Sequence, residues 1–151
     1  MTINEIYIQI KKNEERIAEC RREIINFENK HSELKNIRCE YLDDQEMLFE
    51  FMEDQNKNAS KILNISNMKV ARKYGESLSD FLKSREAEEA KNNINQIIVD
   101  INNALGTLDK KIENLENEIR TCYRRIDTLN ERLRIEKQKE ALKKERNIWQ
   151  I

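Results

Sequence analysis

Apolar side chains recur at alternating intervals of four and three residues from Ile94 to Leu133. With heptad position a on Ile98 and position d on Ile101, this phase holds over five repeats. A sustained a/d repeat is typical of a helix whose narrow apolar stripe, here called the seam, packs against another helix. It predicts a long helix over about residues 84–146, with the seam residues Ile94, Ile98, Ile101, Leu105, Leu108, Ile112, Leu115, Ile119, Ile126, Leu129 and Leu133.

A second heptad pattern opens the chain. Thr2 and Glu5 have the spacing of a capping box, which predicts that a helix starts there. Asn13 and His31 interrupt the pattern, and polar residues in a seam can fix the register of two helices because they need a matching partner. This first helix is predicted over about residues 2–55 or 2–63, and its seam residues are Ile3, Ile6, Ile10, Ile17, Ile24, Phe27 and Leu34.

The segment 54–67 is rich in Asn and Ser, which favour turns and caps. It holds two candidate turns, Gln55–Asn58 and Asn64–Asn67. A reversal at the second would place residue 3 opposite about residue 128 and Leu34 opposite about residue 97, so that the two seams meet. The pattern therefore predicts an all-α antiparallel helical hairpin, a single elongated domain over residues 1–151, and leaves open an intermolecular coiled coil instead.

A mid-segment over residues 68–82 is predicted to form a short extra helix near the turn. Its apolar positions do not share the phase of the long seam, and Gly75 with Ser77 is also compatible with a helix end followed by a helix start. Residues 47–52 are apolar over a wide arc, as in helices that touch more than one neighbour. The side chains left over by the hairpin are the predicted partner contacts: Met47, Phe49, Phe51, Met52, Tyr74, Leu78, Phe81 and Trp149.

The composition agrees with long helices, because the chain has no Pro and only two Gly among its 151 residues. Residues 1–50 carry 8 basic and 12 acidic residues, whereas residues 101–151 carry 12 basic and 9 acidic ones, so the two ends should attract each other. Residues 120–146 hold ten basic and five acidic residues. Such a face can bind phosphates, but the interspersed acids do not favour nucleic acid as the partner.

Residues that carry chemistry are scarce. His31 is the only histidine, no Gly-rich phosphate loop is present, and Cys20, Cys39 and Cys122 have no metal-ligand spacing. We therefore expect no enzyme activity, no metal site, no cofactor and reduced thiols. No apolar run approaches the ~18 residues of a membrane span, and no cleavable signal peptide is expected. The expected location is the cytoplasm, or outside the cell if a partner carries the protein out.

The layout resembles a family of bacterial proteins. A long acidic helix, a Met/Phe-rich stretch, an Asn-rich break, a Tyr-Gly region (Tyr74-Gly75) and a long Ile/Leu heptad helix follow one another. This order is similar to that of the small all-helical accessory proteins encoded beside LXG-domain toxins of Gram-positive type VII secretion systems. The chain has no Trp-x-Gly turn, but Tyr123 and Asp127 match the Tyr-x-x-x-Asp/Glu secretion signal of such systems.

The resemblance implies a function in protein binding. Family members form helical hairpins that pair with the helical LXG domain of the toxin, as chaperone or targeting factor, and help to present it to the secretion machine. For this chain we therefore expect a non-enzymatic accessory protein that binds a helical secreted effector. The alternative is a structural or scaffolding coiled coil that forms homo-oligomers.

Overall fold

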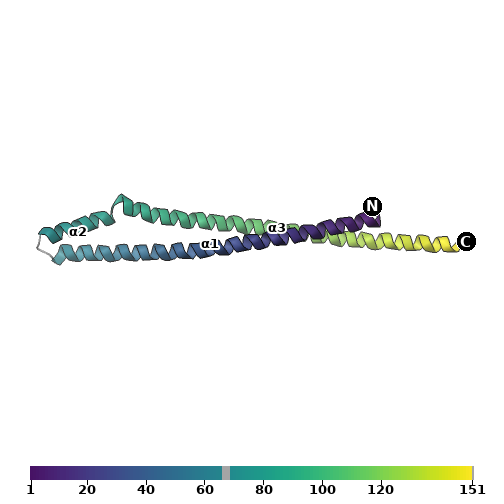
Figure 1. Ribbon diagram of the computed structural model, residues 1–151, viewed down its shortest axis with the longest axis horizontal. Helices are drawn as coiled ribbons and strands as arrows, with labels where there is room; N and C mark the ends of the chain where they lie inside the picture. The colour runs from purple at the N-terminus through teal and green to yellow at the C-terminus, as the bar shows by residue number, and fades with distance from the viewer. Residues whose placement is uncertain (66–68, 151) are drawn as a thin grey trace. The chain divides into compact units, whose positions relative to one another are not determined.

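The computed structural model describes residues 1–65 and 69–150, and all of its regular elements are helices. They are α1 (Ile3–Ile65), α2 (Lys69–Leu82) and α3 (Arg85–Trp149) (Figure 1). The fold is the predicted antiparallel helical hairpin, in which α2 and α3 together form the returning arm and pack against α1.

The breaks between helices only partly follow the predicted turns. The candidate turn Gln55–Asn58 is wrong, because these residues lie inside α1. The candidate turn Asn64–Asn67 lies partly outside the described residues, as does the first residue of the predicted mid-segment 68–82. A further break at Lys83–Ser84 separates α2 from α3, between the predicted mid-segment 68–82 and the long helix predicted from about residue 84.

Side chains cap the two long helices. The Thr2 amide donates a hydrogen bond to Glu5 Oε2 (2.6 Å), and the Glu5 amide donates one to Thr2 Oγ1 (3.2 Å), which confirms the capping box. The bond from the Thr2 amide lowers the pKa of Glu5. Ser84 caps α3, because its Oγ accepts a hydrogen bond from the Ala87 amide (3.4 Å).

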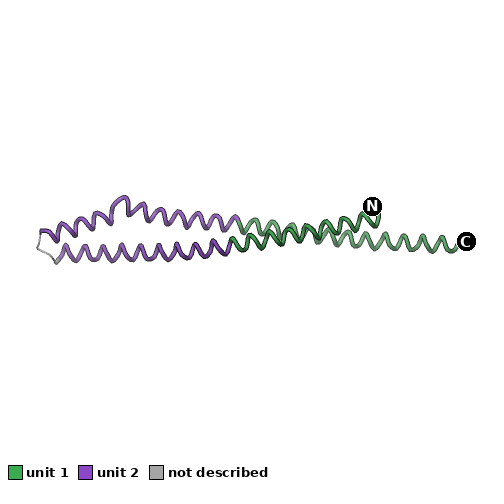
Figure 2. Tube along the Cα trace, in the orientation of Figure 1, with its two compact units in different colours: residues 1–30, 108–151 green, residues 31–107 purple. Residues whose placement is uncertain are grey.

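The contacts divide the chain into two units (Figure 2). Unit 1 joins residues 1–30 to residues 108–151, and unit 2 comprises residues 31–107. In unit 1, the fully buried Ile6 packs with Leu129 and Leu133, and Ile3 and Ile10 cover this cluster.

The core of unit 2 lies between α1 and the break in the returning arm. Met52 packs with Leu82 and Ala87, on either side of that break, and Leu48 and Leu78 complete the cluster. A buried glycine brings α2 close to α1.

That glycine is Gly75, which lies inside α2 and does not end a helix there. A Cβ atom at this position would stand 3.1 Å from Leu63 Cγ and 3.3 Å from the carbonyl oxygen of Ala59. Such contacts are tighter than ordinary van der Waals distances, so the missing side chain permits the close approach of the two helices.

The predicted seam side chains are shielded from solvent in both units. Each seam residue predicted from the heptads is buried or half-buried, and none is exposed. Asn13 is half-buried, and its Nδ2 donates to the carbonyl oxygen of Gln9 (2.8 Å), so this hydrogen bond stays within α1 and does not cross to the other arm.

The register differs from the predicted one in both units. A pairing of residue 3 with about 128 would put Ile6 opposite about residue 125, but Ile6 contacts Leu129 and Leu133. A pairing of Leu34 with about 97 would put Arg38 opposite about residue 93, but Arg38 donates a hydrogen bond to Asn102 (3.0 Å). Counting heptads assumes an unbroken returning helix, whereas the break at Lys83–Ser84 takes up extra residues.

Candidate partner-binding surface

Large apolar side chains are exposed in unit 2, beside its core. Met47 is 67% exposed, Phe51 55% and Phe81 60%. Phe51 and Phe81 border a hollow of about 210 Å³. We call this hollow the groove, and its lining residues are Leu48, Phe51, Met52, Phe81, Leu82, Glu86, Ala87 and Ala90.

The groove exists because of the break between α2 and α3. The Ser84 cap restarts the helix at Arg85, so Phe81 and Ala87 come from two different helices that meet at this point. Ala87 and Ala90 have only a methyl group, which leaves space where larger side chains would fill the wall. An apolar cavity of about 150 Å³ holds a benzene ring, so the groove has room for one large apolar side chain.

The α1 segment that contributes to the groove is acidic. Residues 39–56 contain seven acidic residues and no Lys or Arg: Glu40, Asp43, Asp44, Glu46, Glu50, Glu53 and Asp54. Asp44, Met47, Phe51 and Asp54 follow one another at helical spacings of three, four and three residues, so they share one exposed face of α1. Glu86 adds a carboxylate on the α3 side. Glu86 therefore lines the groove, and Asp44 and Asp54 lie on the α1 face that Phe51 shares; we call these three carboxylates the acidic rim.

A second hollow of about 380 Å³ lies beside Met52 and Phe49, and it is lined by polar residues as well. These are Glu53, Asn56 and Lys91. Lys91 pairs with Glu88 (3.9 Å) and Glu53 with Lys57 (3.4 Å), so the charges here are partly matched within the chain. The groove on the Phe51 side is therefore the better candidate for an apolar ligand.

The structure separates the predicted partner contacts into two groups. Met52 is buried and Leu78 is half-buried in the core of unit 2, so their packing is intramolecular. The other six are exposed: Met47, Phe49, Phe51, Tyr74, Phe81 and Trp149. The sequence patterns considered above did not predict the acidic rim, although the absence of basic residues over 39–56 is visible in the sequence.

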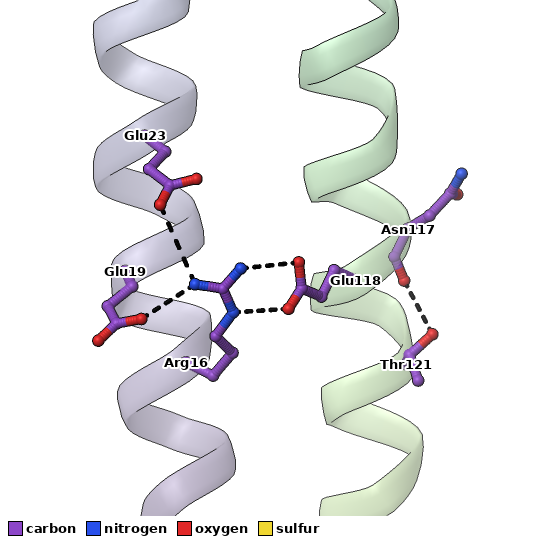
Figure 3. A network of polar contacts seen from close by, with 6 residues as sticks. All are labelled: Arg16, Glu19, Glu23, Asn117, Glu118 and Thr121. Carbon is purple, nitrogen blue, oxygen red and sulfur yellow. Dashed lines mark hydrogen bonds and ion pairs between the residues drawn. The ribbon is translucent and has the colours of Figure 1, made fainter.

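A polar contact joins the two arms in unit 1 (Figure 3). Arg16 donates from Nε to Glu118 Oε1 (2.5 Å) and from Nη2 to Glu118 Oε2 (2.9 Å), which is a bidentate pair. Arg16 also pairs with Glu19 of its own helix (3.0 Å). The hydrogen bonds from Arg16 lower the pKa of Glu118, and those to Glu118 and Glu19 raise the pKa of Arg16.

This pair predicts a pH dependence. A carboxyl group whose pKa is lowered by folding stabilises the protein above its ordinary pKa of 4.5, and this contribution is lost as the pH falls through the folded value. We expect Glu118→Gln to flatten the decrease in Tm between neutral pH and about pH 3, measured by circular dichroism. Glu113→Gln, at an exposed position of the same helix, serves as the control. Equal slopes for wild type and Glu118→Gln would contradict the assignment.

The secretion-signal-like pair lies within α3. Tyr123 accepts a hydrogen bond from Arg21 of the opposite arm, whose guanidinium carbon stands 5.9 Å from the ring centre. Asp127 is exposed one turn later. A receptor that reads Tyr123 would therefore compete with an intramolecular contact, and the role of these two residues stays a prediction.

The structure gives different contacts to the arginines of the basic region. Arg134 pairs with Glu131 (2.7 Å) on α3. Arg124, Arg125 and Arg132 line a hollow of about 390 Å³ in unit 1, together with Gln9 and Asn13.

The three cysteines differ in burial. Cys20 and Cys122 are buried, and Cys39 is exposed. Burial, together with the nearby charge of Glu118, raises the pKa of the Cys20 thiol. The thiolate is the reactive form of cysteine. The burial of Cys20 and its raised pKa therefore both slow its reaction with thiol reagents.

We expect a thiol reagent such as DTNB to modify one cysteine rapidly in the native protein and the other two only after denaturation. Mass spectrometry of peptides from the alkylated protein identifies the fast residue. Cys39→Ser should remove the fast phase. Rapid labelling of Cys20 or Cys122 in the native protein would contradict the packing of unit 1.

Residues 1–65 and 69–150 contain no cluster of three or more His, Cys, Asp or Glu side chains placed to hold a metal ion. Within the same described ranges, no helix combines the length and the apolar character needed to cross a bilayer. Comparisons of the chain with family models, with curated proteins and with solved structures found no match.

Proposed function

We propose that this protein is a non-enzymatic binding partner for another helical protein, and that the groove of unit 2 is its binding surface. The observation that carries the proposal is the exposure of Phe51 and Phe81 at an apolar hollow, with Met47 exposed on the α1 face that Phe51 shares. Exposed apolar clusters of this kind mark protein–protein contacts, because burying them in a complex removes apolar area from water.

The class of the partner rests on the resemblance in layout. Accessory proteins of LXG toxins bind the helical domain of the toxin, so an LXG-type secreted effector is the proposed partner. When an amphipathic helix binds in a groove, large apolar side chains spaced along one of its faces insert into that groove. Phe51 and Phe81 on either side of the groove would hold such an anchor.

Co-expression with the helical domain of a toxin encoded beside this chain tests the proposal. We expect the two proteins to co-purify, and Phe51→Glu with Phe81→Glu to abolish co-purification. Ile25→Glu, at an exposed apolar position of unit 1, is the matched control and should leave the complex intact. Co-purification that survives the double change in the groove would contradict this binding surface, and no complex at all would contradict the proposed function.

A homo-oligomeric structural role is favoured by a different observation. In unit 1, α3 continues beyond its contacts with the start of α1 (Figure 1), and every residue from 137 to 150 is exposed. Leu142, Ile148 and Trp149 are large apolar side chains exposed on this segment.

A further inference from the structure

The C-terminal part of α3 carries a charge opposite to that of the acidic rim of the groove. Ile135, Leu142 and Trp149 are seven residues apart and exposed, so they lie along one face of the helix, which we call the C-terminal stripe. Residues 137–146 carry five basic and two acidic residues. Lys139, Lys143 and Arg146 surround Leu142 and form a shallow hollow with it.

This segment makes few contacts within unit 1. The last cluster between the arms is formed by Ile6, Leu129 and Leu133, and beyond it Lys137 lies over the ring of Tyr7 at 5.5 Å. Trp149 is 87% exposed. A helix with large exposed anchors and a basic face is therefore presented to solvent.

We propose that the C-terminal stripe of one copy docks into the groove of unit 2 in a second copy. The groove offers an apolar hollow for Leu142 or Trp149, and its acidic rim faces the basic residues beside the stripe. Opposite charges around an apolar contact steer the two surfaces together and set their orientation.

The two surfaces differ from each other, so the contact is heterologous. Each chain carries one groove and one C-terminal stripe, and successive copies can add at both ends. A single helix in one groove buries less than the 1,200–2,000 Å² or so of a standard interface, so the association is expected to be weak and reversible. A partner protein bound in the groove would displace the second copy.

Sedimentation velocity of the full chain, from low micromolar to several hundred micromolar, measures this association. We expect the mean mass to rise with concentration beyond that of a dimer, and to fall again at high salt because salt screens the charge pairs. A protein that remains a monomer over the whole range would overturn the proposal. The proposed function with a toxin partner would still stand in that case, because it is read out by co-purification.

Charge reversal identifies the two surfaces. Asp44→Lys with Asp54→Lys changes the groove rim, and Lys143→Glu with Arg146→Glu changes the surroundings of the stripe. Each variant alone should be monomeric, whereas an equimolar mixture should form a complex, because each supplies the wild-type surface that the other lacks. This complex should stop at a heterodimer. Self-association of the groove variant at wild-type strength would show that stripes pair with each other and would overturn the proposal.

Control variants carry the same charge changes on exposed positions of unit 1. Glu113→Lys with Glu116→Lys matches the groove change, and Lys12→Glu with Lys110→Glu matches the stripe change. Both should associate like wild type, and a loss of association in either would contradict a localised contact. Helix content and Tm of all variants, from circular dichroism, show that the fold is retained. Trp149→Ala, without any change in charge, should weaken the association at least tenfold.

Discussion

Leu115→Ala is expected to lower the free energy of unfolding by about 2–5 kcal/mol. Leu115 lies near the middle of α3 on the seam of unit 1 and is only 8% exposed. Truncation removes apolar contacts and leaves a cavity, because helices that pack along a narrow stripe have few side chains that can move in to fill it. Urea denaturation followed by circular dichroism measures the change.

The matched control is the same substitution on the same helix at Leu142, which is 58% exposed. A surface substitution of this kind usually changes stability by no more than about 0.5 kcal/mol. Leu142→Ala should therefore leave the unfolding curve in place, while it weakens the association of copies through the C-terminal stripe. Equal destabilisation by both variants would contradict the assignment of the buried face of α3.

Met52→Asp is expected to be the most damaging single change in unit 2. Met52 is 7% exposed and packs against Leu82 and Ala87. The substitution loses the contacts of a buried Met side chain, worth about 2–5 kcal/mol, and it places a carboxylate in an apolar cluster without a cation. We expect α2 to lose its packing against α1, seen as faster amide hydrogen exchange over residues 69–90.

Met47→Asp provides the comparison, because Met47 lies on α1 five residues earlier and is 67% exposed. Its effect on hydrogen exchange within unit 2 should be small, although it adds a charge to the groove rim and should reduce partner binding. Protection of α2 that is unchanged in Met52→Asp would show that this cluster does not hold the two helices together.

The sequence alone was sufficient for the buried face of each long helix. Heptads at Ile3–Ile24 and Ile94–Leu133 identified side chains that are all buried or half-buried, because a 3.5-residue repeat leaves only one stripe of a helix that can meet a partner. The capping box at Thr2 and Glu5 was equally local, since both hydrogen bonds join residues three positions apart.

The sequence predicted only part of the candidate binding surface. The apolar arc at residues 47–52 pointed to it, yet heptad phase alone did not separate Met52, which is buried, from Met47 and Phe51, which are exposed. The separation depends on where α2 and α3 lie against α1. The groove itself requires Phe81 from α2 and Ala87 from α3, on opposite sides of a break that no Pro or Gly marks.

The amino-acid sequence by itself determined that this chain forms long helices, where the first one begins, and which stripes they bury, because these properties arise from contacts within a few turns of one helix. Only the tertiary structure decided the register of the two arms and the position of the groove. The register depends on the non-helical residues Lys83 and Ser84, which interrupt the returning arm, and on the close approach of α2 to α1 at Gly75. A heptad shift would leave the same stripes facing each other, so the periodicity cannot distinguish between registers.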